Sequence, residues 1–74
     1  MREPVLAFVG LGANLGDAAQ AVRDAIEAIG RLPLTRVTSR SSLYRSAPHQ
    51  ADGPDYINAV VALQTGLNAP ELLA

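Results

Sequence analysis

Cysteine, lysine and tryptophan are absent from this 74-residue sequence, and so are long hydrophobic runs. Without cysteine, disulfide bonds and thiolate metal sites are excluded. Without lysine, six arginines stand against seven acids, and the net charge of −1 argues against a general binder of nucleic-acid backbones. No apolar run approaches the ~18 residues of a membrane span, and no signal-peptide cleavage motif follows the apolar run near the N-terminus. We therefore expect a cytoplasmic protein without nucleic-acid or membrane partners.

The length and the hydrophobic content set further limits. A hydrophobic fraction of 49% is too high for a disordered chain, so the sequence predicts a folded domain. A domain of this size buries only about 60% of its unfolded surface and is marginally stable alone. We therefore expect a partner chain or additional sequence to stabilise it.

Residues 18–29 carry the most regular pattern of the chain. Apolar side chains recur there with the spacing of an amphipathic helix, at Ala18, Ala21, Val22, Ala25, Ile26 and Ile29. Asp17 is a suitable N-cap, and Gln20 is its expected capping-box partner. Gly30 is predicted to lie just outside the helix, and Pro33 prevents the helix from resuming.

Two segments on either side of this helix have the features of strands. Residues 5–11 are apolar on both faces, which predicts a buried strand. Residues 35–44 are more polar, which predicts a strand near a sheet edge. The polar face of that strand is expected to carry Arg36, Thr38, Arg40, Ser42 and Tyr44.

The next part of the sequence predicts a long loop and, further on, a second helix. Residues 46–55 are polar and contain two prolines and a glycine, which is typical of a loop that carries function. At residues 68–71, Asn68 is a suitable cap and Glu71 its capping-box partner. Only a short stretch follows, so we expect the chain to be the N-terminal piece of a longer protein.

Residues 54–65 predict the central strand of the sheet. The odd positions are almost wholly apolar, whereas the even positions open with Tyr56 and Asn58 and become apolar in the middle. Tyr56 and Asn58 then lie on the same face, about 7 Å apart along the strand. A ring and a carboxamide so placed suit a flat heterocycle with a hydrogen-bonding edge. The alternative is that Tyr56 closes the core and Asn58 bonds nearby backbone.

The order of the elements predicts an α+β, ferredoxin-like (split βαβ) sheet with helices on one face, incomplete in this chain. The third strand is expected to lie between the first two and antiparallel to both. This arrangement brings the glycine turn with Gly12 and Asn14, the loop 46–55, and the pair Tyr56 and Asn58 to one rim of the sheet. Three polar or glycine-rich segments that converge in this way indicate a binding site.

The glycine turn permits another interpretation. Glycines at positions 10, 12 and 16 between a strand and a helix partly match a dinucleotide-binding fingerprint, and Arg40 is suited to a 2′-phosphate. However, the spacing is a variant, and Asp17 at the helix start repels phosphate. The alternative role of the turn is tight packing at backbone angles that favour glycine.

Three motifs carry a resemblance to a known family. These are GANLGD at residues 12–17, SSLYRSAP at 41–48 and PDYINAV at 54–60. They resemble successive motifs of 6-hydroxymethyl-7,8-dihydropterin pyrophosphokinase, an ATP-dependent diphosphotransferase of the folate pathway. The similarity runs through essentially the whole chain, so residues 1–74 are expected to form the N-terminal part of a single pyrophosphokinase domain.

The resemblance implies transfer of pyrophosphate from ATP, with Mg²⁺, to the hydroxymethyl group of the pterin. It implies that Tyr56 stacks on the pterin, that Asn58 hydrogen-bonds its edge, and that backbone groups of Ser46, Ala47 and Pro48 help to define the pocket. The metal-binding aspartates and catalytic arginines of the family are not matched in this sequence. We therefore expect no catalytic residue, no bound metal and no activity in this chain alone.

A second hypothesis is a non-catalytic module that binds a ligand or assembles with itself through the same half-fold. Such a module would be stable alone or as a dimer, without dependence on ATP. For a truncated pyrophosphokinase domain, self-association is expected, because an incomplete sheet leaves a strand edge open. The apolar side chains expected to be exposed are those of Val9, Leu11, Val61 and Leu63.

Overall fold

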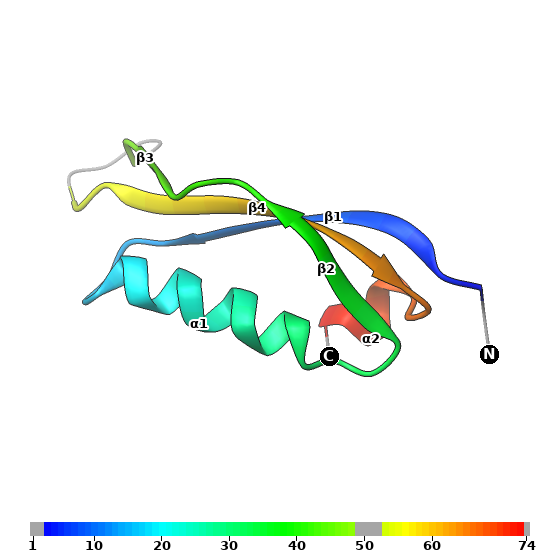
Figure 1. The fold of residues 1–74 in the computed structure, drawn as a ribbon. Coiled ribbons are helices and arrows are strands. Elements are labelled where there is room, and N and C mark those ends of the chain that lie inside the picture. The colour runs from blue at the N-terminus through cyan, green and yellow to red at the C-terminus, as the bar shows by residue number, and fades with distance from the viewer. Residues whose placement is uncertain (1–2, 49–52, 74) are drawn as a thin grey trace.

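The computed structural model describes residues 3–48 and 53–73 of the chain. The elements, in order, are β1 (Val5–Ala13), α1 (Ala18–Gly30), β2 (Thr35–Arg40), β3 (Tyr44–Ser46), β4 (Tyr56–Thr65) and α2 (Ala69–Leu73). The strands form one antiparallel sheet in the order β1-β4-β2, and β3 also pairs with β4. Both helices lie on the same side of this sheet (Figure 1).

This topology confirms the predicted α+β class and is consistent with part of a ferredoxin-like fold. β4 lies between β1 and β2 and runs antiparallel to each, so β1 and β2 are parallel to one another without touching. A right-handed crossover through α1 explains why the gap between them is left open for β4. The central position predicted for β4 is therefore confirmed, and so is the edge position of β2.

The hydrophobic core lies between β4 and α1. The odd-numbered side chains Ala59, Val61 and Leu63 of β4 are almost fully buried, and they pack against Val22 and Ile26 of α1. The alternation predicted for β4 is confirmed, because its even positions Tyr56 and Val60 are more than a third exposed. The period of two along β4 and the apolar stripe of α1 thus meet in one core.

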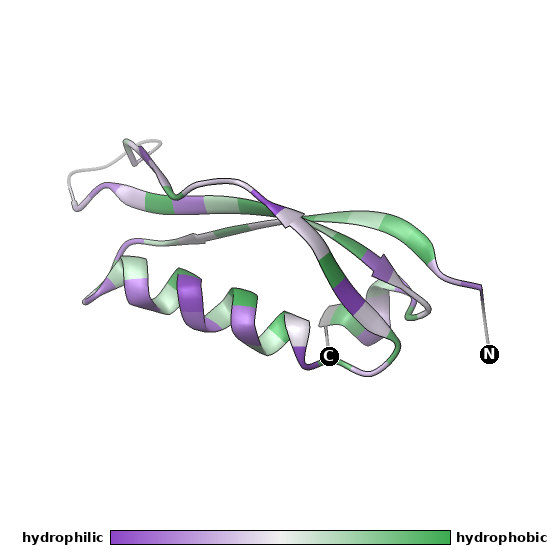
Figure 2. Ribbon diagram, in the orientation of Figure 1, coloured by the Kyte–Doolittle hydropathy of each residue, from purple (hydrophilic) through white to green (hydrophobic). Residues whose placement is uncertain are grey.

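The prediction that β1 is a buried strand is wrong. Leu6 and Phe8 are 56% and 68% exposed, because they lie on the face of the sheet that neither helix covers. Figure 2 colours the first part of β1 green, which marks it as an apolar stretch. The expected exposure of Val61 and Leu63 is also wrong, because α1 covers them completely.

The ends of α1 follow the prediction in part. The Asp17 carboxylate caps the helix by accepting a hydrogen bond from the Gln20 backbone N–H at 3.1 Å. The Gln20 side chain donates to Asp24 instead of returning to the cap, so only half of the predicted capping box forms. Gly30 was predicted to lie just outside α1, but it is the last residue of the helix. In the turn that follows, Leu34 has a positive φ of 57°.

The predicted strand 35–44 is interrupted twice. Thr38 forms a bulge between Val37 and Ser39, and its hydroxyl donates to the Ala62 carbonyl at 3.2 Å. Ser41 then bonds Val60 through its own backbone N–H (2.8 Å) and through its hydroxyl (2.9 Å), which separates β2 from β3. A bulge shifts the alternation of side chains by one residue.

The bulge corrects the prediction of a single polar face. Arg36 pairs with Gln64 and lies on the exposed face of the sheet, whereas Arg40 pairs with Val61 and lies on the α1 side.

The start of α2 is confirmed. Asn68 Oδ1 accepts from the Glu71 backbone N–H at 2.9 Å, and Glu71 Oε1 accepts from the Asn68 backbone N–H at 2.7 Å. This is a complete capping box.

Candidate functional site

The candidate site lies where β1 ends and β4 begins. Gly12 of β1 and Tyr44 of β3 flank Asn58 on either side, and Ser46 stands opposite Tyr56. Residues directly opposite one another share a face of the sheet, so these side chains all lie on the face away from α1. The structure therefore brings together the segments that the predicted topology placed at one rim.

Asn58 is held by two hydrogen bonds from its amide nitrogen. Asn58 Nδ2 donates to the hydroxyl of Ser46 at 2.8 Å and to the backbone carbonyl of Tyr44 at 3.3 Å. The amide oxygen Oδ1 is turned toward β1, where a Cβ atom added to Gly12 would lie 3.0 Å from it. Asn58 is half-buried, so its amide is reachable from the open face.

Tyr56 and the turn residues border this amide. Tyr56 is 37% exposed, and the Cδ1 atom of its ring would lie 3.8 Å from a Cβ atom at Gly12. Asn14 Nδ2 donates to the Pro54 carbonyl at 3.5 Å, which connects the glycine turn to the segment before β4. The site is therefore bordered by the aromatic ring of Tyr56, the amide oxygen of Asn58 and the backbone of Gly12, which has no side chain.

Ala47 and Pro48 directly follow Ser46, the first exposed and the second half-buried. Residues 49–52 of the predicted loop, including His49 and Asp52, lie outside the described residues.

Sequence reasoning missed two contributors to this site. The resemblance assigned only backbone groups to Ser46, but its hydroxyl is the shortest contact of the Asn58 amide. The Tyr44 carbonyl is the second partner of that amide and was not predicted. An antiparallel pairing of residues 44–46 with residues 56–58 would have predicted both contacts. The break at Ser41 was not predicted, and the length and register of β3 therefore could not be predicted either.

The acids of the described part of the chain do not form a metal site. Among residues 3–48 and 53–73, no three His, Asp or Glu side chains come together in a way that suits a metal ion. Asp17 caps α1, Asp24 accepts from Gln20, Glu27 pairs with Arg31 and Glu71 caps α2. Mg²⁺ needs carboxylates together with substrate phosphates, and these residues do not fit that requirement.

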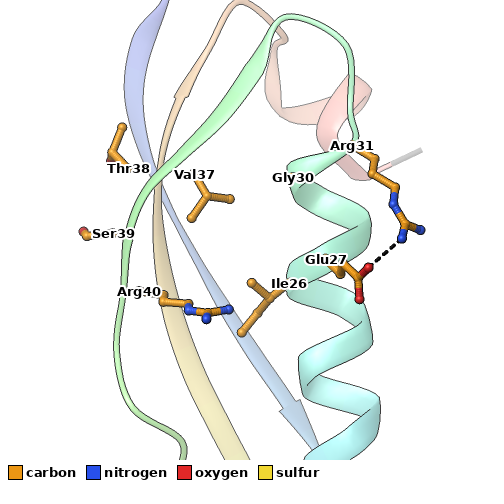
Figure 3. Close-up of a pocket in the computed structure, with 8 residues that line it drawn as sticks. All are labelled: Ile26, Glu27, Gly30, Arg31, Val37, Thr38, Ser39 and Arg40. Atoms are coloured by element: carbon orange, nitrogen blue, oxygen red, sulfur yellow. Dashed lines mark hydrogen bonds and ion pairs between the residues drawn. The ribbon is translucent and has the colours of Figure 1, made fainter.

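A depression of about 540 Å³ lies on the opposite side of the sheet, between α1 and β2. Figure 3 shows Arg40 directed toward Ile26 there, with the Glu27–Arg31 ion pair at the rim. Arg40 is therefore on the far side of the sheet from Asn58. Because β4 separates β1 from β2, the paired parallel strands of a dinucleotide-binding unit are not formed by these two strands.

Comparison with known proteins relates the chain to one enzyme family. The family model described as 7,8-dihydro-6-hydroxymethylpterin-pyrophosphokinase (HPPK) matches residues 8–74. The chain belongs to this family. The similarity suggested by the three motifs is thereby confirmed.

Individual members of the HPPK family are similar to the chain over most of its length. It is 41% identical to the 2-amino-4-hydroxy-6-hydroxymethyldihydropteridine pyrophosphokinase of Pseudomonas putida, covering 93% of this chain and 58% of that protein. With the proteins of the same name from Haemophilus influenzae and Pseudomonas aeruginosa, the identities are 37% and 42%, over 93% and 89% of this chain. These matches cover 44% and 41% of the two relatives, so the chain spans about half the length of the relatives it matches.

In the described ranges, neither α1 nor α2 has the length and apolar character needed to cross a membrane.

Proposed function

We propose that the chain is the N-terminal, pterin-binding part of a pyrophosphokinase domain of folate biosynthesis. The observation that supports it best is the arrangement of Asn58 and Tyr56 on the open face of β4, beside the side-chain-free backbone of Gly12. A flat ring system needs an apolar surface to stack on and a polar group at its edge, and this rim offers both. Membership of the HPPK family gives the reaction class.

In the proposed reaction the oxygen of the pterin hydroxymethyl group attacks the β-phosphorus of ATP. The bond between that phosphorus and the oxygen bridging to the α-phosphate breaks, AMP leaves, and the hydroxyl proton is released. The product carries the diphosphate as an ester. The role of the described residues in this scheme is to bind and orient the pterin, with Tyr56 stacking on the ring, Asn58 bonding its edge, and Ser46, Ala47 and Pro48 bordering the pocket.

ATP and Mg²⁺ belong to the proposal for the whole protein, by which we mean the complete domain that contains these residues. Metal ions neutralise charge in phosphoryl transfer, so acids able to hold them must act beside the triphosphate. Because the described acids do not fit, we place the metal ligands and the nucleotide contacts in the rest of that domain. The cytoplasmic location and the lack of nucleic-acid or membrane partners stay predictions from composition.

The experiment that tests the function measures AMP formation by the whole protein with ATP, Mg²⁺ and 6-hydroxymethyl-7,8-dihydropterin. We expect AMP and the pterin diphosphate in equal amounts, and neither product when the pterin is omitted. The 74-residue segment alone is expected to form no AMP and to give no saturable heat with Mg²⁺ and ATP. Failure of the whole protein to form the diphosphate would overturn the proposed reaction.

Self-association of the isolated segment is favoured by its exposed apolar face. Leu6, Phe8 and Val60 are 56%, 68% and 38% exposed, and they lie on the sheet face that lacks a helix. Exposed apolar patches of this kind are typical of interaction surfaces. We expect light scattering coupled to size exclusion to show dimers or larger species of the segment. A monodisperse monomer would contradict the expected self-association. Self-association by itself does not favour the alternative of a non-catalytic assembling module. That alternative would be supported only if the whole protein also failed to form the pterin diphosphate.

A further inference from the structure

We propose that the groove between α1 and the end of β2 is a binding site for a phosphate group, which Arg23 and Arg40 hold between them. This phosphate groove is separate from the proposed pterin rim, because Arg40 lies on the α1 side of the sheet and Asn58 on the open side. Its existence does not depend on the proposed function.

A β-bulge turns Arg40 toward the groove. Arg40 pairs with Val61, which is fully buried in the cluster that contains residues of α1. Residues three positions apart on a regular strand point to opposite faces, so Arg40 shares the face of Val37 only because the ladder skips Thr38. Figure 3 shows the resulting direction of Arg40, toward Ile26 of α1. Bulges often re-aim a side chain at a functional site in this way.

The phosphate groove contains a small cavity next to the depression of Figure 3. Its volume is about 240 Å³, and it is lined by Arg23, Ile26, Arg40, Ser41, Ser42 and Leu43. Sites for drug-sized ligands occupy about 300–1,000 Å³, so this cavity suits a small ion better than a whole nucleotide.

Most of the donors along the cavity have no acceptor. Among the described residues, neither Arg23 nor Arg40 forms an ion pair or a hydrogen bond. In the same part of the chain, the backbone N–H groups of Ser42 and Leu43 also have no partner, and neither does the Ser42 hydroxyl. These segments therefore offer an anion two guanidinium groups, a hydroxyl and two backbone N–H groups.

The acids of α1 do not neutralise this cavity. Glu27 lies one turn after Arg23 but bonds Arg31 at 2.6 Å, and Asp24 accepts from Gln20 at 2.8 Å. No acid is among the described residues that line the cavity. Two cations that face one space without an acid repel each other, and an anion between them turns this repulsion into attraction.

The placement of the donors favours phosphate over a carboxylate. A guanidinium group donates two parallel hydrogen bonds to either anion. A carboxylate presents only two oxygens, which lie in one plane, whereas the oxygens of a phosphate point in tetrahedral directions. A phosphate can therefore accept from Arg23 on α1, from Arg40 on β2 and from the segment at Ser42 at the same time.

The first test is an NMR titration of the uniformly ¹⁵N-labelled whole protein with sodium phosphate at neutral pH, against sodium chloride of equal ionic strength. We expect saturable shifts of the backbone signals of Ser42 and Leu43 and of the Nε–H signals of Arg23 and Arg40. The dissociation constant should be on the order of 1 mM, because water weakens exposed ion pairs. Since these signals report on the groove alone, phosphate bound elsewhere does not confuse the result. Absence of saturable shifts at these residues would overturn the proposal.

Two further probes define the ligand. Sodium acetate should bind severalfold more weakly than phosphate, and equal binding would overturn the assignment to a phosphate group. Methyl phosphate distinguishes the free ion from a phosphate ester. Tighter binding of methyl phosphate would identify an ester as the ligand, and weaker binding would identify free phosphate. Either result supports a phosphate site.

Arg40→Met tests the charge apart from the packing. Methionine keeps an apolar chain over Ile26, so a residue that only covers the core would leave phosphate binding unchanged. We expect binding to weaken at least about fivefold, the loss typical of one hydrogen bond. Arg36→Met is the matched control, because Arg36 lies on the same strand but pairs with Gln64 on the open face, and it should bind phosphate as the wild type does. Equal binding by the two variants would contradict the proposal.

Arg23→Gln provides a second variant that does not depend on the packing of β2. Arg23 is exposed on α1, so its replacement should leave the fold intact, which circular dichroism checks. We expect phosphate binding to weaken by a factor similar to that of Arg40→Met. Unchanged binding in folded Arg23→Gln would overturn the pairing of the two arginines around one anion.

Discussion

Leu63→Ala is expected to destabilise the domain by about 2–5 kcal/mol, the usual cost of truncating a buried leucine. Leu63 is 0% exposed in the middle of β4, in the cluster that contains Val22 and Ile26 of α1. Domains of this kind have a free energy of unfolding of only about 5–15 kcal/mol, so the variant should melt at a much lower temperature. Thermal unfolding followed by circular dichroism, at one fixed protein concentration because association shifts the midpoint, measures the effect.

Val60→Ala is the matched control for this prediction. Val60 lies three residues away on the same strand, but on the open face and 38% exposed. We expect it to cost less than about 1 kcal/mol, as partly exposed positions usually do. A loss at Val60 as large as that at Leu63 would show that the two faces of β4 are assigned the wrong way round.

Asn58→Ala is expected to weaken pterin binding by the whole protein about tenfold or more. Removing the amide leaves the donors of the bound pterin without a partner, which costs about 1–3 kcal/mol for a group withdrawn from water. Tyr56→Phe should change the affinity far less, because phenylalanine keeps the ring that stacks. ATP binding should barely change in either variant. Ligand titration of each variant gives the affinities.

Circular dichroism of the Asn58→Ala variant provides the control for folding. Asn58 also bonds Ser46 and Tyr44, so its loss can loosen β3 without any ligand present. A variant that stays folded and binds pterin as tightly as the wild type would make Asn58 a structural residue of the strand.

Much of the fold was predictable because periodic patterns decide it. The stripe on α1, the alternation along β4 and the cap at Asn68 each depend on neighbours within a few residues, and each is confirmed. The central place of β4 followed from the handedness of the crossover. The juxtaposition of Gly12, Tyr56 and Asn58 followed in turn from that topology.

The remaining errors have physical causes that a local pattern does not contain. Phe8 and Leu6 look like core residues, but whether a face is covered depends on where the helices pack. The break at Ser41 arises because a serine hydroxyl takes the place of a backbone partner for Val60, which polarity alone does not reveal. The orientation of the Asn58 amide depends on the carbonyl of Tyr44, a residue fourteen positions earlier in the sequence.

The most direct test of the central claim, that pterin binds at the rim formed by β1, β3 and β4, is an NMR titration. Uniformly ¹⁵N-labelled whole protein is titrated with 6-hydroxymethylpterin while the backbone signals are followed. We expect saturable shifts of Gly12, Ser46 and Asn58 with a single dissociation constant, and no shift of Val37 or Arg40, which border the depression behind the sheet. Saturable shifts at Val37 and Arg40, with Gly12 and Asn58 unmoved, would contradict the proposed site.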